Sequence, residues 1–281
     1  MHASPPAAPP REDADGALRS LQAKGRYLFR SEEFARLTGR EPRSVAVKSA
    51  LARLSKSGKV ASLVRRPPTW LIVPPEQEHY GAPPVTWWLD DFLHPAEPGY
   101  YVALLSAARH WGSAHYAQQL THVMVSRQRR PLDIGRQRIV FTHKTAAART
   151  PTVIAHNSVA PYKVSTREAT LLDLIRHHKD VGGLEAIVRV AKDFAPALTA
   201  DGLVEALDAQ AKPAAGQRLG FLLGILRPKL AGPVAKWLRG RVTRREALEP
   251  TEADEGRSVL YSADWRIEYT ERQLELIKEL S

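Results

Sequence analysis

The hydrophobic positions of residues 42–58 repeat with the spacing of an amphipathic helix. They fall at i, i+3, i+4 and i+7 and form one apolar stripe: Val47, Ala50, Leu51 and Leu54. We expect Pro42 in the first turn, because its missing N–H needs no partner there, and a helix end at Gly58. The opposite side and the preceding turn carry donors suited to nucleic acid: Arg40, Arg43, Ser44, Lys48 and Arg53.

A shorter helix is predicted immediately before this one. Ser31 is a suitable N-cap, and two glutamates follow in the first turn, where the helix dipole favours negative charge. The apolar positions lie to one side, and Gly39 ends the segment: Phe34, Ala35 and Leu37 precede it. A short helix, a glycine turn and a longer basic helix follow one another in the order of a helix-turn-helix unit.

Two short strands are predicted after the basic helix. Residues 59–64 and 69–73 are apolar and rich in β-branched side chains, and Arg65-Arg66-Pro67-Pro68 joins them. Prolines cannot donate to a ladder, so they mark the tip of a hairpin. Such a hairpin is the wing of a winged helix-turn-helix, and its arginines, Arg65 and Arg66, would reach DNA. The alternative is a small helical domain whose charged face is only solvated.

The rest of the chain divides into a linker and a larger domain. Residues 74–84 are rich in proline and polar side chains, which places a boundary near Gly81. We therefore predict a disordered lead-in over residues 1–15, a DNA-binding domain over 16–80 and a C-terminal domain over 81–281. The fold class is α+β, with the winged helix-turn-helix first and a mixed domain of strands followed mainly by helices after it.

The order of elements in the C-terminal domain follows from the same patterns. Residues 99–112 read as a helix ending at Gly112. Four strands are expected next, over residues 121–126, 136–144, 151–156 and 159–164. A run of helices begins at Thr166, which is a suitable N-cap. Residues 258–269 return to strand character before a closing amphipathic helix capped by Thr270.

Composition favours an anionic partner. The chain has 281 residues, 41 Lys and Arg against 30 Asp and Glu, a formal charge of +11 and no cysteine. The absence of cysteine excludes disulfides, thiolate nucleophiles and cysteine-ligated zinc. The N-terminus lacks the pattern of a signal peptide, and the chain lacks an apolar run long enough to span a membrane. We expect a cytoplasmic protein without a membrane partner.

Two further basic runs lie in the predicted C-terminal domain. The first extends from Arg127 to Arg149, includes Lys144, and supplies candidate surface residues: Arg127, Arg129, Arg130, Arg136 and Arg138. The second reaches Arg245 and supplies four more: Arg239, Arg241, Arg244 and Arg245. They would extend the DNA footprint or meet an acidic protein or RNA. The alternative is that the acidic segment after Glu246 neutralises them within the fold.

The sequence offers no recognisable catalytic, cofactor or metal motif. Walker, Rossmann and GxSxG patterns are absent, and the spacing of His110, His115 and His122 does not match HExxH. Glu168 and Asp173 are five positions apart and would not converge on one helix face. We predict no enzyme activity. A nuclease or modification subunit targeted by the winged helix, and a ligand-sensing regulator, remain the alternatives.

Three stretches resemble a known family. They are LTGREPRSVAVKSALARLSKSGKV at residues 37–60, YYVALLSAARHWG at residues 100–112, and KVSTREATLLDLI at residues 163–175, which QRLGFLLGIL follows. The chain resembles the AbiEi family, the antitoxin and transcriptional-repressor proteins of AbiE type IV toxin–antitoxin systems. The likeness covers most of the chain from Ser31 to Leu226.

The resemblance implies a protein with two activities. The N-terminal domain would bind inverted repeats in double-stranded DNA at its own promoter and repress the operon. The C-terminal domain would counteract a partner toxin resembling a nucleotidyltransferase, without a stable complex being required. No cofactor or metal is implied.

Overall fold

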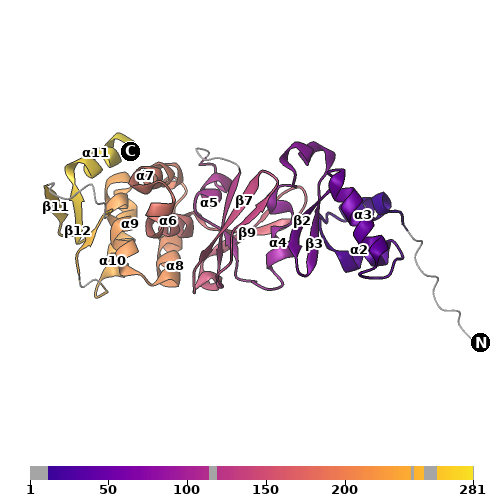
Figure 1. The fold of residues 1–281 in the computed structure, drawn as a ribbon. Coiled ribbons are helices and arrows are strands. Elements are labelled where there is room, and N and C mark those ends of the chain that lie inside the picture. The colour runs from indigo at the N-terminus through magenta and orange to yellow at the C-terminus, as the bar shows by residue number, and fades with distance from the viewer. Residues whose placement is uncertain (1–11, 114–118, 242–243, 250–257, 281) are drawn as a thin grey trace, which may run out of the picture. The chain divides into compact units, whose positions relative to one another are not determined.

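The structure is a computed structural model that describes residues 12–113, 119–241, 244–249 and 258–280. The described residues form two compact units. The first contains residues 12–95 together with Leu132–Arg138 and His156–Tyr162, and the second contains the others. Helices, strands and several sheets occur in one chain (Figure 1), which confirms the α+β fold class.

A winged helix-turn-helix lies in the first unit. It contains α1 (Ala14–Gln22), β1 (Leu28–Arg30), α2 (Ser31–Leu37), α3 (Val45–Lys56), β2 (Val60–Arg65) and β3 (Pro68–Ile72). The three strands form an antiparallel sheet in the order β1-β3-β2. The predicted stripe of α3 packs into the core of this unit, which includes Phe29, Phe34, Val47, Leu51 and Leu54. The wing turns at the predicted prolines, whereas β1 was not predicted.

The starts of α2 and α3 differ from the predictions. Ser31 is the first helical residue rather than the N-cap, and its hydroxyl accepts a 2.9 Å hydrogen bond from Trp70 Nε1. The helix α3 begins at Val45, not near Pro42, because Ser44 caps it with a 3.3 Å bond from Val47 N–H to its Oγ. A serine hydroxyl is a favoured acceptor for such a bond, so Pro42 lies before the helix rather than in its first turn.

The segment predicted as a linker has structure of its own. It contains the 3₁₀ helix η1 (Pro75–Tyr80), and η2 (Val85–Trp87) and α4 (Leu89–Leu93) follow it. Trp88, Leu89 and Leu93 are buried. The domain boundary near Gly81 stays a prediction, and residues 1–11 of the predicted lead-in lie outside the described residues.

A six-stranded sheet contains all four strands predicted for the C-terminal domain. Its order is β6-β7-β5-β4-β9-β8. The strands are β4 (Tyr101–Val102), β5 (Leu120–Val125), β6 (Leu132–Ile134), β7 (Gln137–His143), β8 (Thr152–His156) and β9 (Pro161–Ser165). The prediction of a helix over residues 99–112 is wrong at its start. Val102 pairs with Val123 and Val164 in the sheet, and α5 (Leu104–His110) begins only two residues later.

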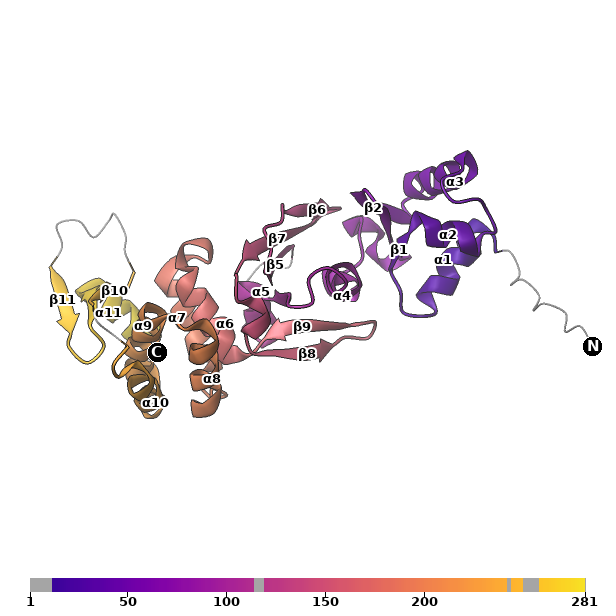
Figure 2. The ribbon, with the colours of Figure 1, turned by 90° about the horizontal axis from the view of Figure 1, so that it is seen from below.

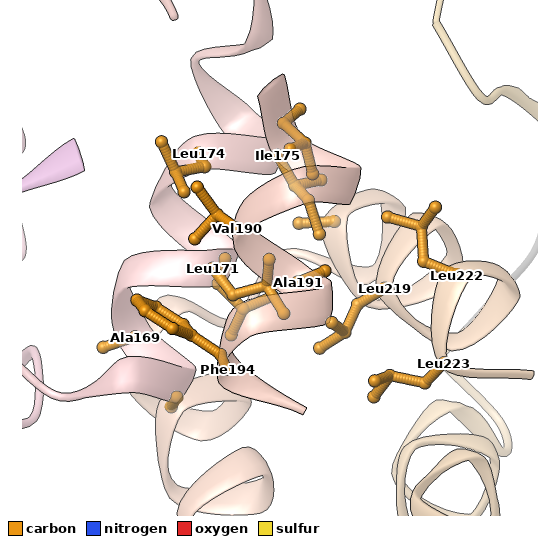
Figure 3. Close-up of a cluster of buried hydrophobic side chains, with 14 of the residues drawn as sticks. Ala169, Leu171, Leu174, Ile175, Val190, Ala191, Phe194, Leu219, Leu222 and Leu223 are labelled. Carbon is orange, nitrogen blue, oxygen red and sulfur yellow. The ribbon is translucent and has the colours of Figure 1, made fainter. Parts of the chain in front are cut away.

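The predicted helical region is confirmed. It contains α6 (Arg167–Arg176), α7 (Gly183–Phe194), α8 (Ala200–Gln210), α9 (Pro213–Leu226) and α10 (Pro228–Leu238). Thr166 caps α6 as predicted, accepting a 3.2 Å bond from Ala169 N–H. Figure 3 shows buried side chains of α6, α7 and α9 packed together, among them Leu171, Val190 and Leu219.

A small sheet and a helix close the described chain. The strands β10 (Glu246–Ala247), β11 (Val259–Ser262) and β12 (Ile267–Thr270) pair in the order β10-β12-β11, and α11 (Glu271–Leu280) follows (Figure 2). Thr270 caps α11, and Gln273 returns a bond to the Thr270 N–H at 3.0 Å. None of the described helices combines the length and the apolar composition needed to cross a membrane.

Candidate nucleic-acid interface

A basic groove lies between α3 and the wing. Its cavity has a volume of about 600 Å³. Five cations line it: Arg30, Arg43, Lys48, Arg65 and Arg66. Apolar side chains contribute most of the remaining lining, chiefly Val47, Leu51, Pro67, Pro68 and Trp70, and Ser31 and Glu32 complete it. Long donors around an apolar surface suit a phosphate backbone lying beside a sugar edge.

The groove is built on rigid supports. On the α3 side, Val47 and Leu51 are buried in the core of the first unit. On the wing side, the Trp70 indole donates to Ser31 at the start of α2, so the hairpin is tied to the preceding helix. The cations therefore project from elements whose backbones are fixed by packing, which lowers the entropic cost of ordering them on DNA.

Arg43 occupies an unusual position at the mouth of the groove. It precedes α3 rather than lying on it, and its φ is 65°. Its side chain is 87% exposed and lies 3.9 Å from Glu32, itself a groove residue. An ion pair this exposed stabilises the fold little, so the guanidinium is free to exchange the carboxylate for a phosphate.

The other predicted DNA-binding residues divide by environment. Arg43, Lys48, Arg65 and Arg66 meet in the groove, whereas Arg40, Ser44 and Arg53 do not line it. The hydroxyl of Ser44 is occupied as the α3 cap. Arg40 is half-buried, and its Nη1 has no hydrogen-bond partner within the described parts of the chain. Arg30 was not predicted, because only the fold brings the end of β1 to this groove.

The first basic run of the C-terminal region is less uniform than the sequence suggests. Arg127, Arg130 and Arg136 are exposed and Arg129 is half-buried. Arg138 lies 3.6 Å from Asp133, and both side chains are exposed. The inclusion of Lys144 in this surface run was wrong. Its ammonium is buried 2.7 Å from Asp173 and is not part of any surface.

The second basic run is partly neutralised by nearby carboxylates. Arg244 Nε lies 2.9 Å from Glu246, and Arg245 lies 3.6 Å from Glu268. These pairs agree with the alternative of internal neutralisation. Arg241 stacks on Trp237, with its guanidinium carbon 4.6 Å from the ring centroid. Arg239 is exposed at the end of α10.

The candidate catalytic side chains have separate structural partners. Glu168 accepts a 3.0 Å bond from Thr199 N–H, and Asp173 accepts a 2.7 Å bond from the Tyr101 hydroxyl. They therefore do not form an acid/base pair. Burial lowers the pKa of His122 below its ordinary value, and the nearby Asp180 carboxylate opposes this shift. Across the described residues, no group of three His, Asp or Glu side chains is placed to hold a metal ion.

Comparisons with known proteins agree with this architecture. One solved structure, that of the RV2827C protein from Mycobacterium tuberculosis, is similar with a TM-score of 0.64 and 18% identity over 98% of each chain. At this identity the likeness shows a shared fold. No curated protein matches the chain. Residues 101–225 match the family described as the AbiEi antitoxin C-terminal domain. This range contains the stretch at residues 163–175 and all but the first residue of the stretch at residues 100–112. Residues 101–225 therefore carry an AbiEi antitoxin C-terminal domain.

Proposed function

We propose that this antitoxin binds double-stranded DNA at its own promoter and represses its operon. The observation that carries the proposal is the groove between α3 and the wing, where Arg43, Lys48, Arg65 and Arg66 converge. In a winged helix-turn-helix, the second helix enters the major groove and the wing reaches the adjacent backbone. The formal charge of +11 supports binding of a polyanion.

The proposal divides the chain between two tasks. Residues 16–80 form the DNA-binding domain, and residues 81–281 counteract a nucleotidyltransferase-like toxin, with no stable complex required. The match of residues 101–225 to an antitoxin domain supports the second task. Exposed arginines such as Arg127, Arg130 and Arg239 offer a surface for an acidic partner. The chain acts as a cytoplasmic regulator rather than as an enzyme, in keeping with its regulatory family.

The test is a titration of the full chain on DNA. Fluorescence anisotropy would compare the sequence upstream of its own gene with a scrambled duplex at two salt concentrations. We expect selective binding and a steep decline with salt, because released counterions drive association. The double variant Arg65→Ala/Arg66→Ala should lose selective binding, whereas Lys179→Ala, an exposed lysine of the second unit, should not. Equal weak binding to both duplexes would refute repression by direct DNA contact.

A further inference from the structure

The exposed face of α3 is not uniformly basic. At about 3.6 residues per turn, the positions opposite the buried stripe are i, i+4 and i+7 from the first helical residue. These are Val45, Ser49 and Ala52, and all three are exposed. Lys48 and Arg53 flank this row on either side. Over the first two turns of α3 the centre of the face is therefore small and uncharged, with the cations at its borders, and Lys56 continues the row in the last turn.

Val45 stands out in this row. It is 78% exposed, the highest value among the large hydrophobic side chains that remain exposed in the described chain. It occupies the first position of α3, directly after the Ser44 cap. A β-branched apolar side chain in water gains nothing at this position, and valine is a poorer helix former than alanine.

The surroundings of Val45 fit nucleic acid rather than an apolar protein surface. Its exposed neighbours on the helix are Ala46, Lys48 and Ser49, so it does not belong to a larger hydrophobic patch. Arg43 precedes it with an exposed side chain, and α3 contains no acidic residue. Small side chains at Ser49 and Ala52 would let the helix backbone approach the floor of a major groove.

We infer that Val45 is a specificity-determining residue that reads the 5-methyl group of a thymine. The thymine methyl is the apolar feature that the major groove presents, and the first turn of a recognition helix is the part that reaches base edges. The flanking cations, Arg43 and Lys48, hold the backbone while Val45 contacts the base. This inference rests on the proposed DNA binding, and it assigns specificity to an uncharged residue.

The test removes the same methyl contact first from the DNA and then from the protein. Every thymine of the bound upstream site is replaced singly by deoxyuridine, which lacks only the 5-methyl group, and the full chain is titrated on each duplex. Burying one methyl group corresponds to about a four-fold change in affinity. We expect one thymine per half-site at which deoxyuridine weakens wild-type binding by about that factor.

Val45→Ala should remove that sensitivity. The variant should bind the thymine duplex about four-fold more weakly per occupied half-site than wild type and bind both duplexes equally at the sensitive position. Its log–log salt slope should match wild type, because no phosphate contact is lost. Val259→Ala, which changes a 55% exposed valine on β11, should behave as wild type in every titration.

Two results would overturn the inference while leaving the proposed function intact. One is selective wild-type binding with no thymine sensitive to deoxyuridine. The other is a Val45→Ala protein that keeps the full discrimination between thymine and deoxyuridine. Failure of the wild-type chain to prefer its upstream DNA is a different outcome, and it would overturn the proposed function together with the inference.

Discussion

Lys144 Nζ lies 2.7 Å from Asp173 Oδ1 in the interior of the second unit, where the two side chains are 3% and 0% exposed. The pair is not isolated. Tyr101 donates to Asp173 Oδ2 at 2.7 Å, Gln210 donates to Oδ1 at 2.9 Å, and Lys144 also donates to the Tyr101 hydroxyl at 2.8 Å. The network joins β4, α6, α8 and the residue after β7, so one carboxylate ties the sheet to the helices.

Replacing Lys144 should therefore be costly. In Lys144→Met the Asp173 carboxylate would stay buried without its counter-charge, and such a loss costs about 3–5 kcal/mol. Burial lowers the pKa of Lys144, while the charge of Asp173 opposes that shift. Each charge is desolvated and depends on the other, so removing either side chain leaves the other charge buried without compensation. Urea unfolding of the full chain would measure the change in the free energy of unfolding.

The matched control is Lys179→Met, which alters an exposed lysine of the same unit. It should change stability by less than about 0.5 kcal/mol, as surface substitutions usually do. If Lys144→Met were as mild as Lys179→Met, the network would contribute nothing beyond packing.

Acidification should destabilise the fold through buried imidazoles. Burial lowers the pKa values of His122 and His177 in the folded state, so near pH 6 the unfolded chain binds more protons. Stability is then present above the unfolded value of about 6.5 and is lost as the pH falls through the folded pKa. The fall between pH 7.5 and 5.5 should be smaller in His122→Asn. Parallel pH profiles for the two proteins would contradict this role of His122.

Gly220 marks a close approach that a methyl group would fill. A Cβ atom there would lie 2.0 Å from Cζ3 of Trp265, a partly buried residue packed on the helical core. Gly220→Ala should destabilise the fold by about 1–3 kcal/mol, because the indole must move. Gly224 lies in the same helix, and a Cβ atom there would be 3.5 Å from Trp265 Nε1, an ordinary contact distance, so Gly224→Ala should be neutral or stabilising by up to about 1 kcal/mol. Thermal unfolding would compare the two, and equal melting temperatures would exclude the clash.

Helix ends and turns that depend on interactions between near neighbours in the sequence were predicted correctly. Thr166 as a cap, Gly58 as a helix end and the prolines of the wing each act within a few residues, so the sequence located them. The predicted start of α3 was wrong because Pro42 and Ser44, which both suit the beginning of a helix, lie two residues apart. Only the structure shows that Ser44 accepts the bond.

The features that the sequence did not predict depend on contacts between residues far apart in the chain. Tyr101 and Val102 are flanked by helix-forming residues, yet pairing with β5 and β9 makes them a strand. Lys144 lies in a basic run but is buried, because Asp173 is 29 positions away in sequence and adjacent in space. Most of the groove cations could be predicted from the sequence as exposed basic residues. The place of Arg30 in the groove and the uncharged centre of the first two turns of α3 became apparent only in the structure.

Salt dependence should separate phosphate contacts from other contributions to DNA binding. Arg43→Ala and Arg65→Ala should each weaken operator binding at moderate salt by about ten-fold or more and lower the magnitude of the log–log slope by about 0.9. Both side chains are exposed, so the circular dichroism spectrum should not change. Full operator affinity in both variants would show that the groove is not the DNA-binding face.

Charge reversal in the second unit should separate antitoxin activity from repression. Arg239 is exposed at the end of α10, so Arg239→Glu should impair rescue from the toxin in a growth assay and leave operator affinity unchanged. Arg245 is already engaged by Glu268 and by the Tyr261 ring, with its guanidinium carbon 4.3 Å from that ring's centroid. Arg245→Glu would place two carboxylates together and act through local repulsion, so it should lower thermal stability where Arg239→Glu does not. A loss of operator affinity in Arg239→Glu, with rescue intact, would assign this end of α10 to the DNA footprint instead.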